Sequence, residues 1–271
     1  MIPVAFDYHR PSSVDEAIEL LSDDAKLLAG GHSLLPAMKL RLSSPGALID
    51  IGRIAELNYI REDGGTIAIG ATTTHHQIES SDLVSAKASA LAQAASVIGD
   101  PQVRNKGTIG GSLAHADPAA DYPAAILALG AEIVVRGPDG GRSIPADEFF
   151  IDLFLTALAP DEIITEVRVP TADKSAYVKF PHPASRFAVV GCAAASAGGA
   201  VKVAFTGVAN AAFRDSGVEE ALSGGLSEES IAAAAARAAD GQEVLADHFA
   251  GEEYRRHLAK VFARKALSAI A

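Results

Sequence analysis

The stretch from Gly99 to Pro123 constrains the fold of this chain more than any other, because glycines and prolines interrupt it throughout. It holds four of the 24 glycines and three of the 13 prolines. A segment this long with few large apolar residues is either functional or disordered in a compact chain. The run Gly107–Ser112 favours function, because glycines let backbone N–H groups form a nest for an anion. We predict a long anion-binding loop, to which Thr108 and Ser112 add hydroxyl groups; a tight surface loop without a ligand is the alternative.

A second glycine pair, Gly30–Gly31, follows an apolar strand-like segment and precedes a helix-like one. That order places free N–H groups and a helix N-terminus beside the glycines, which suits an anion. Two such segments predict one ligand with two phosphates, held between two lobes, and a dinucleotide is the simplest candidate. The spacing of Rossmann and P-loop motifs is absent from the sequence, which disfavours both. His32 either shapes this loop or contacts the ligand.

Composition excludes several classes of function. The chain has 271 residues, 49% of them hydrophobic, which is enough for two or three lobes. Its net charge is 23 − 34 = −11, which argues against nucleic acid and anionic membranes as partners. The single cysteine, Cys192, excludes an internal disulfide and a cysteine-ligated iron–sulfur cluster, and we expect it to be buried. The sequence shows no signal peptide and no membrane-spanning run, so we expect a cytoplasmic protein.

Hydrophobic periodicity predicts three consecutive units. In residues 1–57 we expect helices at 14–21 and 34–42 and strands at 25–29 and 47–51, with Ser13 and Glu16 as a capping box. In residues 58–170 we expect strands at 66–70, 132–136, 142–145 and 163–169, and helices at 74–84, 85–98 and up to Leu129. In residues 171–271 we expect strands at 176–180, 187–195 and 200–208, then helices at 228–239 and 252–270.

Histidines and carboxylates give weaker signals. His75 and His76 are adjacent, so on a helix they point about 100° apart, and we interpret them as surface residues rather than metal ligands. His115, Asp117 and Asp121 are close in sequence, but this loop supplies no second histidine for a catalytic zinc. We therefore expect no metal, and interpret the carboxylates as fixing the loop or receiving ligand hydroxyls. The residues also suggest no catalytic nucleophile or base.

These motifs carry a resemblance to a known family. Ala29-Gly-Gly-His-Ser-Leu-Leu-Pro with Met38-Lys-Leu-Arg-Leu, and Thr108-Ile-Gly-Gly-Ser, resemble the two flavin loops of the medium subunits of molybdenum hydroxylases. The opening Phe6-Asp-Tyr-His-Arg-Pro is similar to the medium subunits of aerobic carbon monoxide dehydrogenases, and the resemblance covers essentially the whole chain. It implies an α+β fold: a two-lobed FAD-binding domain of the vanillyl-alcohol oxidase (PCMH) type, at 1–57 and 58–170. A C-terminal domain, 171–271, follows with a three-stranded sheet and a helical bundle.

The resemblance also implies the cofactor site. Leu27–Leu34 and Thr108–Ser112 would hold the FAD pyrophosphate through backbone N–H groups of both loops. Asp121 would lie near the cofactor, Ile98 and Ile164 would give apolar contacts, and Lys179 would stand beside the flavin. The full set of implied residues is Leu27, Leu28, Ala29, Gly30, Gly31, His32, Ser33, Leu34, Ile98, Thr108, Ile109, Gly110, Gly111, Ser112, Asp121, Ile164 and Lys179. There, Lys179 would stabilise reduced flavin by its charge; without the resemblance, a solvated lysine on an edge strand is as good an interpretation.

The function implied is electron transfer within a larger enzyme. A molybdenum-binding large subunit would oxidise the substrate, and a small subunit with [2Fe-2S] clusters would relay electrons to FAD on this chain. This chain would pass them to a quinone or another acceptor, in a dimer of heterotrimers that is cytoplasmic or peripheral to the inner face of the membrane. Carbon monoxide is the implied substrate. The alternatives are a related hydroxylase acting on an aldehyde, a purine or an N-heterocycle, a stand-alone FAD oxidase, and a nucleotide-binding scaffold without redox activity.

Overall fold

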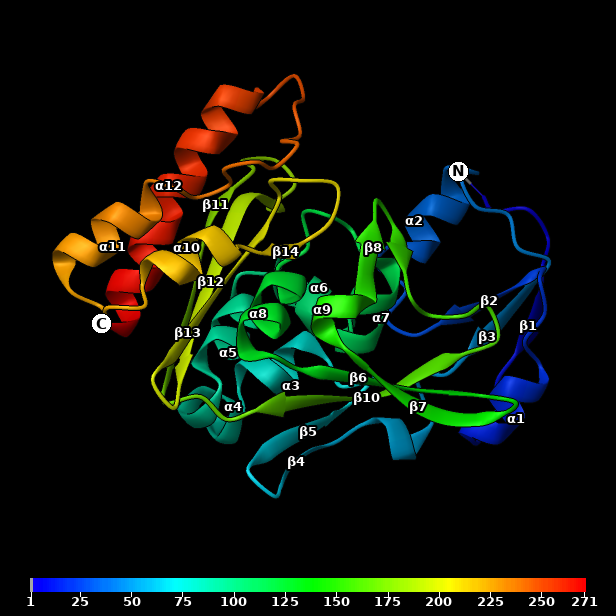
Figure 1. Ribbon diagram of the computed structural model, residues 1–271. Coiled ribbons are helices and arrows are strands. Elements are labelled where there is room, and N and C mark those ends of the chain that lie inside the picture. The colour runs from blue at the N-terminus through cyan, green and yellow to red at the C-terminus, as the bar shows by residue number, and fades with distance from the viewer. Residues whose placement is uncertain (1) are drawn as a thin grey trace.

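The computed structural model describes residues 2–271, and its N-terminal unit is a small parallel sheet with two short helices (Figure 1). Its strands are β1 (Asp7–His9), β2 (Ala25–Leu28) and β3 (Ala47–Asp50), in the order β1-β3-β2; the helices are α1 (Val14–Glu19) and α2 (Leu34–Lys39), and η1 (Ala55–Leu57) ends the unit. Helix α1 begins where the Ser13 hydroxyl accepts the Glu16 N–H, as predicted. The Glu16 carboxylate, however, accepts from Ser12, so only half of the predicted capping box forms.

The central unit is an antiparallel sheet covered on one face by helices. The strands are β4 (Ile60–Asp63), β5 (Thr66–Gly70), β6 (Glu132–Gly137), β7 (Gly140–Pro145) and β10 (Ile163–Pro170), in the order β4-β5-β10-β6-β7. The helices are α3 (His75–Glu79), α4 (Asp82–Lys87), α5 (Ser89–Ser96), α6 (Pro101–Arg104), α7 (Ile109–His115), α8 (Tyr122–Leu129) and α9 (Ala146–Phe149), and a small hairpin joins β8 (Phe150–Asp152) to β9 (Leu155–Thr156). Every residue of α8 is buried, because α8 lies between this sheet and the C-terminal one (Figure 1).

The predicted long loop from Gly99 to Pro123 is wrong as a description of the backbone, because α6 and α7 lie within it. The Thr108 hydroxyl accepts the Gly111 N–H and caps α7, so Gly110 and Gly111 lie inside a helix. Glycine is needed there, because a methyl group at position 110 would lie only 2.7 Å from the Cβ of Ala71. Close packing of a helix on a strand has overridden the low helix propensity of glycine.

The C-terminal unit has one strand more than predicted. The sheet order is β11-β12-β13-β14, with bounds β11 (Lys174–Pro181), β12 (Ala188–Ala197), β13 (Ala200–Thr206) and β14 (Phe213–Arg214). Strand β14 has two residues, too few for a hydrophobic period to reveal it. The helices are α10 (Ser216–Ala221), α11 (Glu228–Ala235) and α12 (Glu252–Ile270); α11 ends four residues before the predicted bound, and α12 matches its prediction.

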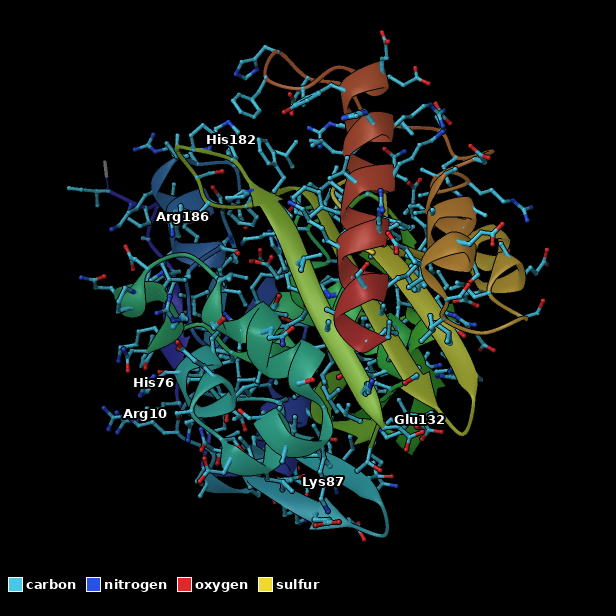
Figure 2. The ribbon with its side chains drawn as sticks, turned by 90° about the vertical axis from the view of Figure 1, so that its left-hand side faces the viewer. Arg10, His76, Lys87, Glu132, His182 and Arg186 are labelled. Atoms are coloured by element: carbon cyan, nitrogen blue, oxygen red, sulfur yellow. The ribbon has the colours of Figure 1, made fainter. Side chains whose placement is uncertain are left out.

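A buried arginine fastens α12 to the C-terminal sheet. The Arg255 guanidinium donates to the carbonyl oxygens of Val189 and Gly207, each at 2.6 Å, and to the Asp247 carboxylate at 2.7 Å. Helix α12 lies along β11 in Figure 2. None of the helices in residues 2–271 is both long enough and apolar enough to cross a bilayer.

Candidate functional site

The two glycine segments, which are far apart in sequence, touch in space. A methyl group at Gly30 would lie 2.2 Å from the carbonyl oxygen of Lys106, immediately before the second segment. A methyl group at Gly111 would lie 4.0 Å from the Cβ of Ala29. The prediction that both segments converge in space is therefore confirmed. Only glycine permits this approach at position 30, because the opposing atoms belong to backbone.

A cavity of about 730 Å³ lies beside this junction, within the size range of small-molecule and cofactor sites. All three units contribute to its wall. Fifteen of the residues implied by the resemblance line it: Leu27, Leu28, Ala29, Gly30, Gly31, His32, Ser33, Leu34, Ile98, Thr108, Gly110, Gly111, Ser112, Asp121 and Ile164. Two do not, Ile109 and Lys179. Ile109 is fully buried in the core of the central unit, and the position of Lys179 is described below.

The first glycine segment presents free backbone donors to this cavity. Within residues 2–271, the N–H groups of Gly30, Gly31, His32 and Ser33 have no protein acceptor. Gly31 has a φ of +74°, which turns the chain between β2 and α2. Consecutive unpaired N–H groups at the wall of a cavity can bind an anion.

The second glycine segment uses most of its backbone donors inside the protein. The Ile109 N–H donates to the Thr73 carbonyl, and the Gly110 N–H donates to the Ala71 carbonyl. The N–H groups of Gly111 and Ser112 donate to the hydroxyl and the carbonyl of Thr108. The Thr108 N–H, by contrast, has no protein acceptor within residues 2–271, so this segment offers one free backbone donor where the first offers four. Thr108 and Ser112 line the cavity, so the segment contributes that N–H group, the side-chain hydroxyl of Ser112 and a closely packed glycine surface.

Lys179 is buried behind the cavity wall. Its side chain is 5% exposed, so the interpretation as a solvated lysine is wrong, although β11 is an edge strand. Its ammonium group donates to the Asp121 carboxylate at 3.0 Å and to the carbonyl oxygens of Val97 and Arg186, each at 2.8 Å. Burial raises the pKa of Asp121, and the neighbouring charge of Lys179 opposes that rise. The lysine thus joins three segments that border the cavity.

The loop after β11 borders the cavity opening. Ser185, Arg186 and Phe187 line the cavity and are exposed. The loop closes on itself, because the His182 N–H donates to the Phe187 carbonyl at 2.8 Å and the Arg186 N–H donates to the His182 carbonyl at 2.9 Å. Figure 2 shows His182 and Arg186 beyond one end of β11.

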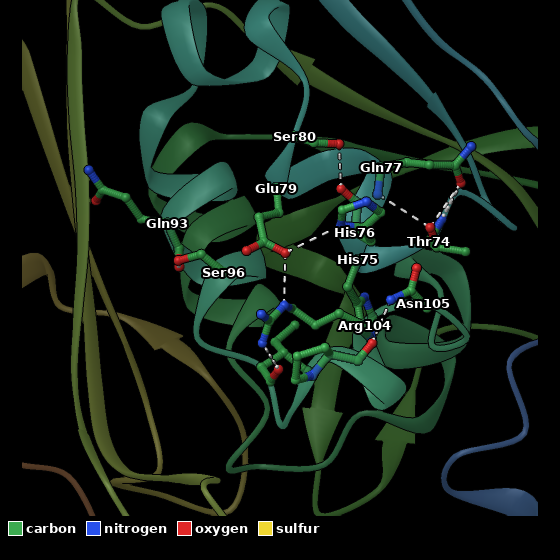
Figure 3. Close-up of polar contacts among 12 residues, drawn as sticks. Thr74, His75, His76, Gln77, Glu79, Ser80, Gln93, Ser96, Arg104 and Asn105 are labelled. Atoms are coloured by element: carbon green, nitrogen blue, oxygen red, sulfur yellow. Dashed lines mark hydrogen bonds and ion pairs between the residues drawn. The ribbon is translucent and has the colours of Figure 1, made fainter.

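His75 contradicts its interpretation as a surface residue. It is 5% exposed and lines the cavity, whereas His76 faces solvent. Burial lowers the pKa of His75 to about 4, with smaller contributions from His32 and Arg104, so the ring is neutral near pH 7. Its Nδ1 lies 3.1 Å from the Tyr122 hydroxyl. The sequence offered one signal for this. Thr74 and Gln77 form a capping box that fixes where the helix begins (Figure 3), and His75 then lies three residues before the apolar Ile78, on the same helix face.

An ion pair holds α6 against α3 near this histidine. The Arg104 Nε donates to the Glu79 carboxylate at 2.8 Å, and its guanidinium also reaches the Ile98 carbonyl at 3.2 Å (Figure 3). Both interactions fix the segment that leads into the second glycine pair. Within residues 2–271, no cluster of three His, Cys, Asp or Glu side chains is arranged to hold a metal ion. His115, Asp117 and Asp121 therefore form no such cluster.

Two family models match nearly all of the chain. The model described as "FAD binding domain in molybdopterin dehydrogenase" matches residues 4–172. The model described as "CO dehydrogenase flavoprotein C-terminal domain" matches residues 175–270. The boundary between them falls between β10 and β11, where the sheet of the central unit gives way to the C-terminal sheet.

Several relatives match over nearly their full length. The carbon monoxide dehydrogenase medium chain of Hydrogenophaga pseudoflava is 44% identical over 99% of this chain and 98% of its own. The glyceraldehyde dehydrogenase medium chain of Sulfolobus acidocaldarius is 37% identical over 100% of both. Among solved structures, a carbon monoxide dehydrogenase from Hydrogenophaga pseudoflava that lacks the Mo-pyranopterin moiety of its cofactor aligns with a TM-score of 0.94, covering 100% of this chain and 98% of that one, at 45% identity.

Identity at this level over whole chains fixes the family as well as the fold, and the family's cofactor is FAD. The cavity at the junction of the two glycine segments suits such a group. It offers unpaired backbone donors, and its glycines leave space that a side chain in their place would occupy. The chain belongs to the FAD-binding medium subunits of the molybdenum hydroxylases.

Proposed function

We propose that the chain binds FAD in the cavity between its glycine segments and is the flavin subunit of a hydroxylase that oxidises carbon monoxide. The observation that carries the site is the run of unpaired N–H groups at Gly30–Ser33, in residues that line a cavity together with the second segment. These donors suit the pyrophosphate, and two residues with hydroxyl groups, Ser33 and Ser112, also line the cavity. Backbone donors need no positive side chain, which agrees with a net charge of −11.

FAD, when bound, supplies the electron-transfer chemistry, and the protein supplies position and electrostatics. Ile98 and Ile164 line the cavity and exclude water from an apolar part of its wall. Lys179 reaches the cavity through Asp121, whose carboxylate it holds in the wall. In this proposal the lysine acts on the flavin by fixing that carboxylate and by its charge, rather than by direct contact.

We propose that partner subunits supply the remaining redox centres. Cys192 is buried, and burial raises the pKa of its thiol well above the usual range, so this cysteine is a poor ligand. Iron–sulfur clusters and molybdenum therefore belong to other chains: a small and a large subunit, in a dimer of heterotrimers. The acceptor would be a quinone or a similar oxidant. Assembly in the cytoplasm or at the inner face of the membrane is part of this proposal.

Glyceraldehyde, or another aldehyde, is the second candidate substrate. The identities of 44% to one carbon monoxide dehydrogenase medium chain and 37% to another favour carbon monoxide. The glyceraldehyde dehydrogenase medium chain is also 37% identical, so a hydroxylase that acts on an aldehyde is the second candidate. In this proposal the large subunit, a different chain, selects the substrate.

Purification of the native complex tests both the flavin site and the choice of substrate. We expect a yellow protein that contains FAD, molybdenum and iron, with two additional chains on a denaturing gel. Reduction of a dye by carbon monoxide, but not by glyceraldehyde, supports the first substrate; the reverse supports the second. A purified chain that stays colourless when FAD is added contradicts the flavin site itself. Direct reduction of its flavin by an aldehyde, without partner chains, would instead support a stand-alone oxidase.

A further inference from the structure

We propose that Tyr177, in the C-terminal unit, is a positioning residue for the flavin cavity, because its hydroxyl fixes the Asp121 carboxylate in the cavity wall. Asp121 belongs to the segment matched by the FAD-binding model, and Tyr177 to the segment matched by the C-terminal model. The C-terminal unit would then complete the cofactor site rather than merely follow it. The inference rests on the proposed FAD site and deepens it.

Both oxygens of the Asp121 carboxylate are held by β11. The Tyr177 hydroxyl donates to Oδ1, and the Lys179 ammonium donates to Oδ2 at 3.0 Å. Asp121 is 4% exposed, so neither oxygen can exchange its partner for bulk water at low cost. Without the tyrosine hydroxyl, Oδ1 loses its donor, and the carboxylate is free to turn towards the ammonium group or the cavity.

A glycine on the neighbouring strand makes room for the tyrosine. A methyl group at Gly191, on β12, would lie 2.3 Å from the Tyr177 hydroxyl oxygen. Gly191 is paired with Lys179 across the two strands, so the space lies directly beside the ion pair. The Tyr177 N–H is fixed too, since it donates to the Gln93 side chain at 2.7 Å. The phenol therefore has one place to lie, with its hydroxyl against Asp121.

The backbone before Asp121 is held by the same sheet. The Thr206 hydroxyl lies 2.7 Å from the carbonyl oxygens of both Pro118 and Ala120, to which it can donate its proton. The Gly207 N–H donates to the Pro118 carbonyl at 2.7 Å, and the Ala188 N–H donates to the Ala119 carbonyl at 3.1 Å. Hydrogen bonds from β12, from β13 and from Gly207, which follows β13, thus hold the turn between α7 and α8 in place. Its side chains Asp117, Ala120 and Asp121 line the cavity.

The charges around Asp121 agree with this arrangement. Burial and the neighbouring carboxylate raise the pKa of Tyr177 well above 10, so the phenol keeps its proton and remains a donor. Burial raises the pKa of Asp121, whereas Lys179 and the Tyr177 hydroxyl lower it. The buried Tyr122 hydroxyl is the other titratable group on which Asp121 acts, and the pKa of Tyr122 is also raised.

The test is Tyr177→Phe in the full chain, titrated with FAD by flavin fluorescence. The substitution keeps the ring and removes only the donor, and we expect affinity for FAD to fall about tenfold. Tyr254→Phe, a half-exposed tyrosine on α12, is the matched control and leaves affinity unchanged. Gly191→Ala displaces the same phenol from the other strand and should reproduce the loss, which provides a second test if Tyr177→Phe does not fold.

A double-mutant cycle separates positioning from a general structural role. Asp121→Asn weakens FAD binding on its own, and Tyr177→Phe in that background should cost less than threefold more, because the carboxylate it acts through is gone. Additive losses, or unchanged affinity in Tyr177→Phe, overturn the inference. A wild-type chain that fails to bind FAD contradicts the proposed function instead, so the two failures are distinct.

Discussion

The two glycine segments carry the same Gly-Gly pair and use their backbones in opposite ways. At Gly30–Gly31 the N–H groups lack protein acceptors, and both residues line the cavity. At Gly110–Gly111 every N–H group donates to a protein oxygen, within or beside a helix. The first pair is therefore suited to a ligand, and the second lets a helix approach a strand and the first pair. A motif alone does not distinguish these roles; the partners of its donors do.

Gly30→Ala should have the largest effect on this comparison. Its methyl group would lie 2.2 Å from the Lys106 carbonyl oxygen, so the segments must separate and the free N–H groups must move. We expect FAD affinity to fall roughly a thousandfold, about 4 kcal/mol. Fluorescence titration measures it, with Gly224→Ala, which meets no atom within 4 Å, as the control. Affinity near that of the wild type would show that contact between the segments is dispensable.

The loss of stability of the folded chain in acid should depend on His75, which lies beside the second glycine segment. Its pKa is about 4 in the folded chain against an ordinary 6.5, so between these values the unfolded chain binds the proton and the folded chain does not. Stability should thus fall by up to about 3 kcal/mol as the pH drops from 6.5 to 4. His75→Gln should flatten this part of the pH dependence in urea unfolding. His76→Gln, the exposed neighbour, should leave it in place, and equal effects of the two variants would contradict the assignment.

Gly110→Ala against Gly111→Ala tests the packing role of the second pair. The methyl group at position 110 would meet backbone and Cβ atoms of Ala71 within 2.8 Å, and we expect a loss of about 2 kcal/mol in unfolding free energy. At position 111 the nearest atom is the Thr108 hydroxyl at 2.9 Å, a cap that can rotate, so the loss should be about 1 kcal/mol or less. Urea unfolding without FAD compares the two. Equal losses would mean that contact with Ala71 does not decide the cost.

Ser112→Ala should have the smallest effect. Its hydroxyl is one of the polar groups that the second segment offers to the cavity, and its loss should weaken FAD binding about fivefold, near 1 kcal/mol. Ser80→Ala removes an exposed hydroxyl on α3 and is the control for titration. A loss as large as that of Gly30→Ala would mean that both segments hold the phosphates equally, which contradicts the asymmetry described above.

Much of this could be predicted from sequence, for identifiable reasons. Helix α12 matched to the residue because a charged first turn and a regular apolar stripe mark it. The convergence of the glycine segments was confirmed, since two rare patterns in one chain suggest a shared ligand. The helix α7 was missed, because its glycines are stabilised there by Ala71, a partner distant in sequence. The burial of His75 was not predicted, because adjacent histidines look alike unless the helix face that His75 shares with Ile78 is recognised.

The position of Lys179 shows a different limit. The residue was identified from the resemblance, but neither its burial nor its partners could be predicted, because the partners are the residue after α5, the residue before α8 and Arg186 in the loop after β11. Tyr177 gave no sequence signal at all. Its proposed role depends on Gly191, which meets it when β11 pairs with β12, and on Asp121, which meets it only when the C-terminal sheet packs against the central unit.

Arg186 has a practical consequence for handling the protein. It is exposed, has a φ of +66° and lies in the short turn at the cavity opening, followed by Phe187 rather than proline. Trypsin should therefore cut there early in native digestion, while Arg255, buried under the sheet, is spared. The rate of that cleavage then reports on the cavity opening without any label. A cofactor or a neighbouring chain that covers the opening should slow cleavage, which a gel detects.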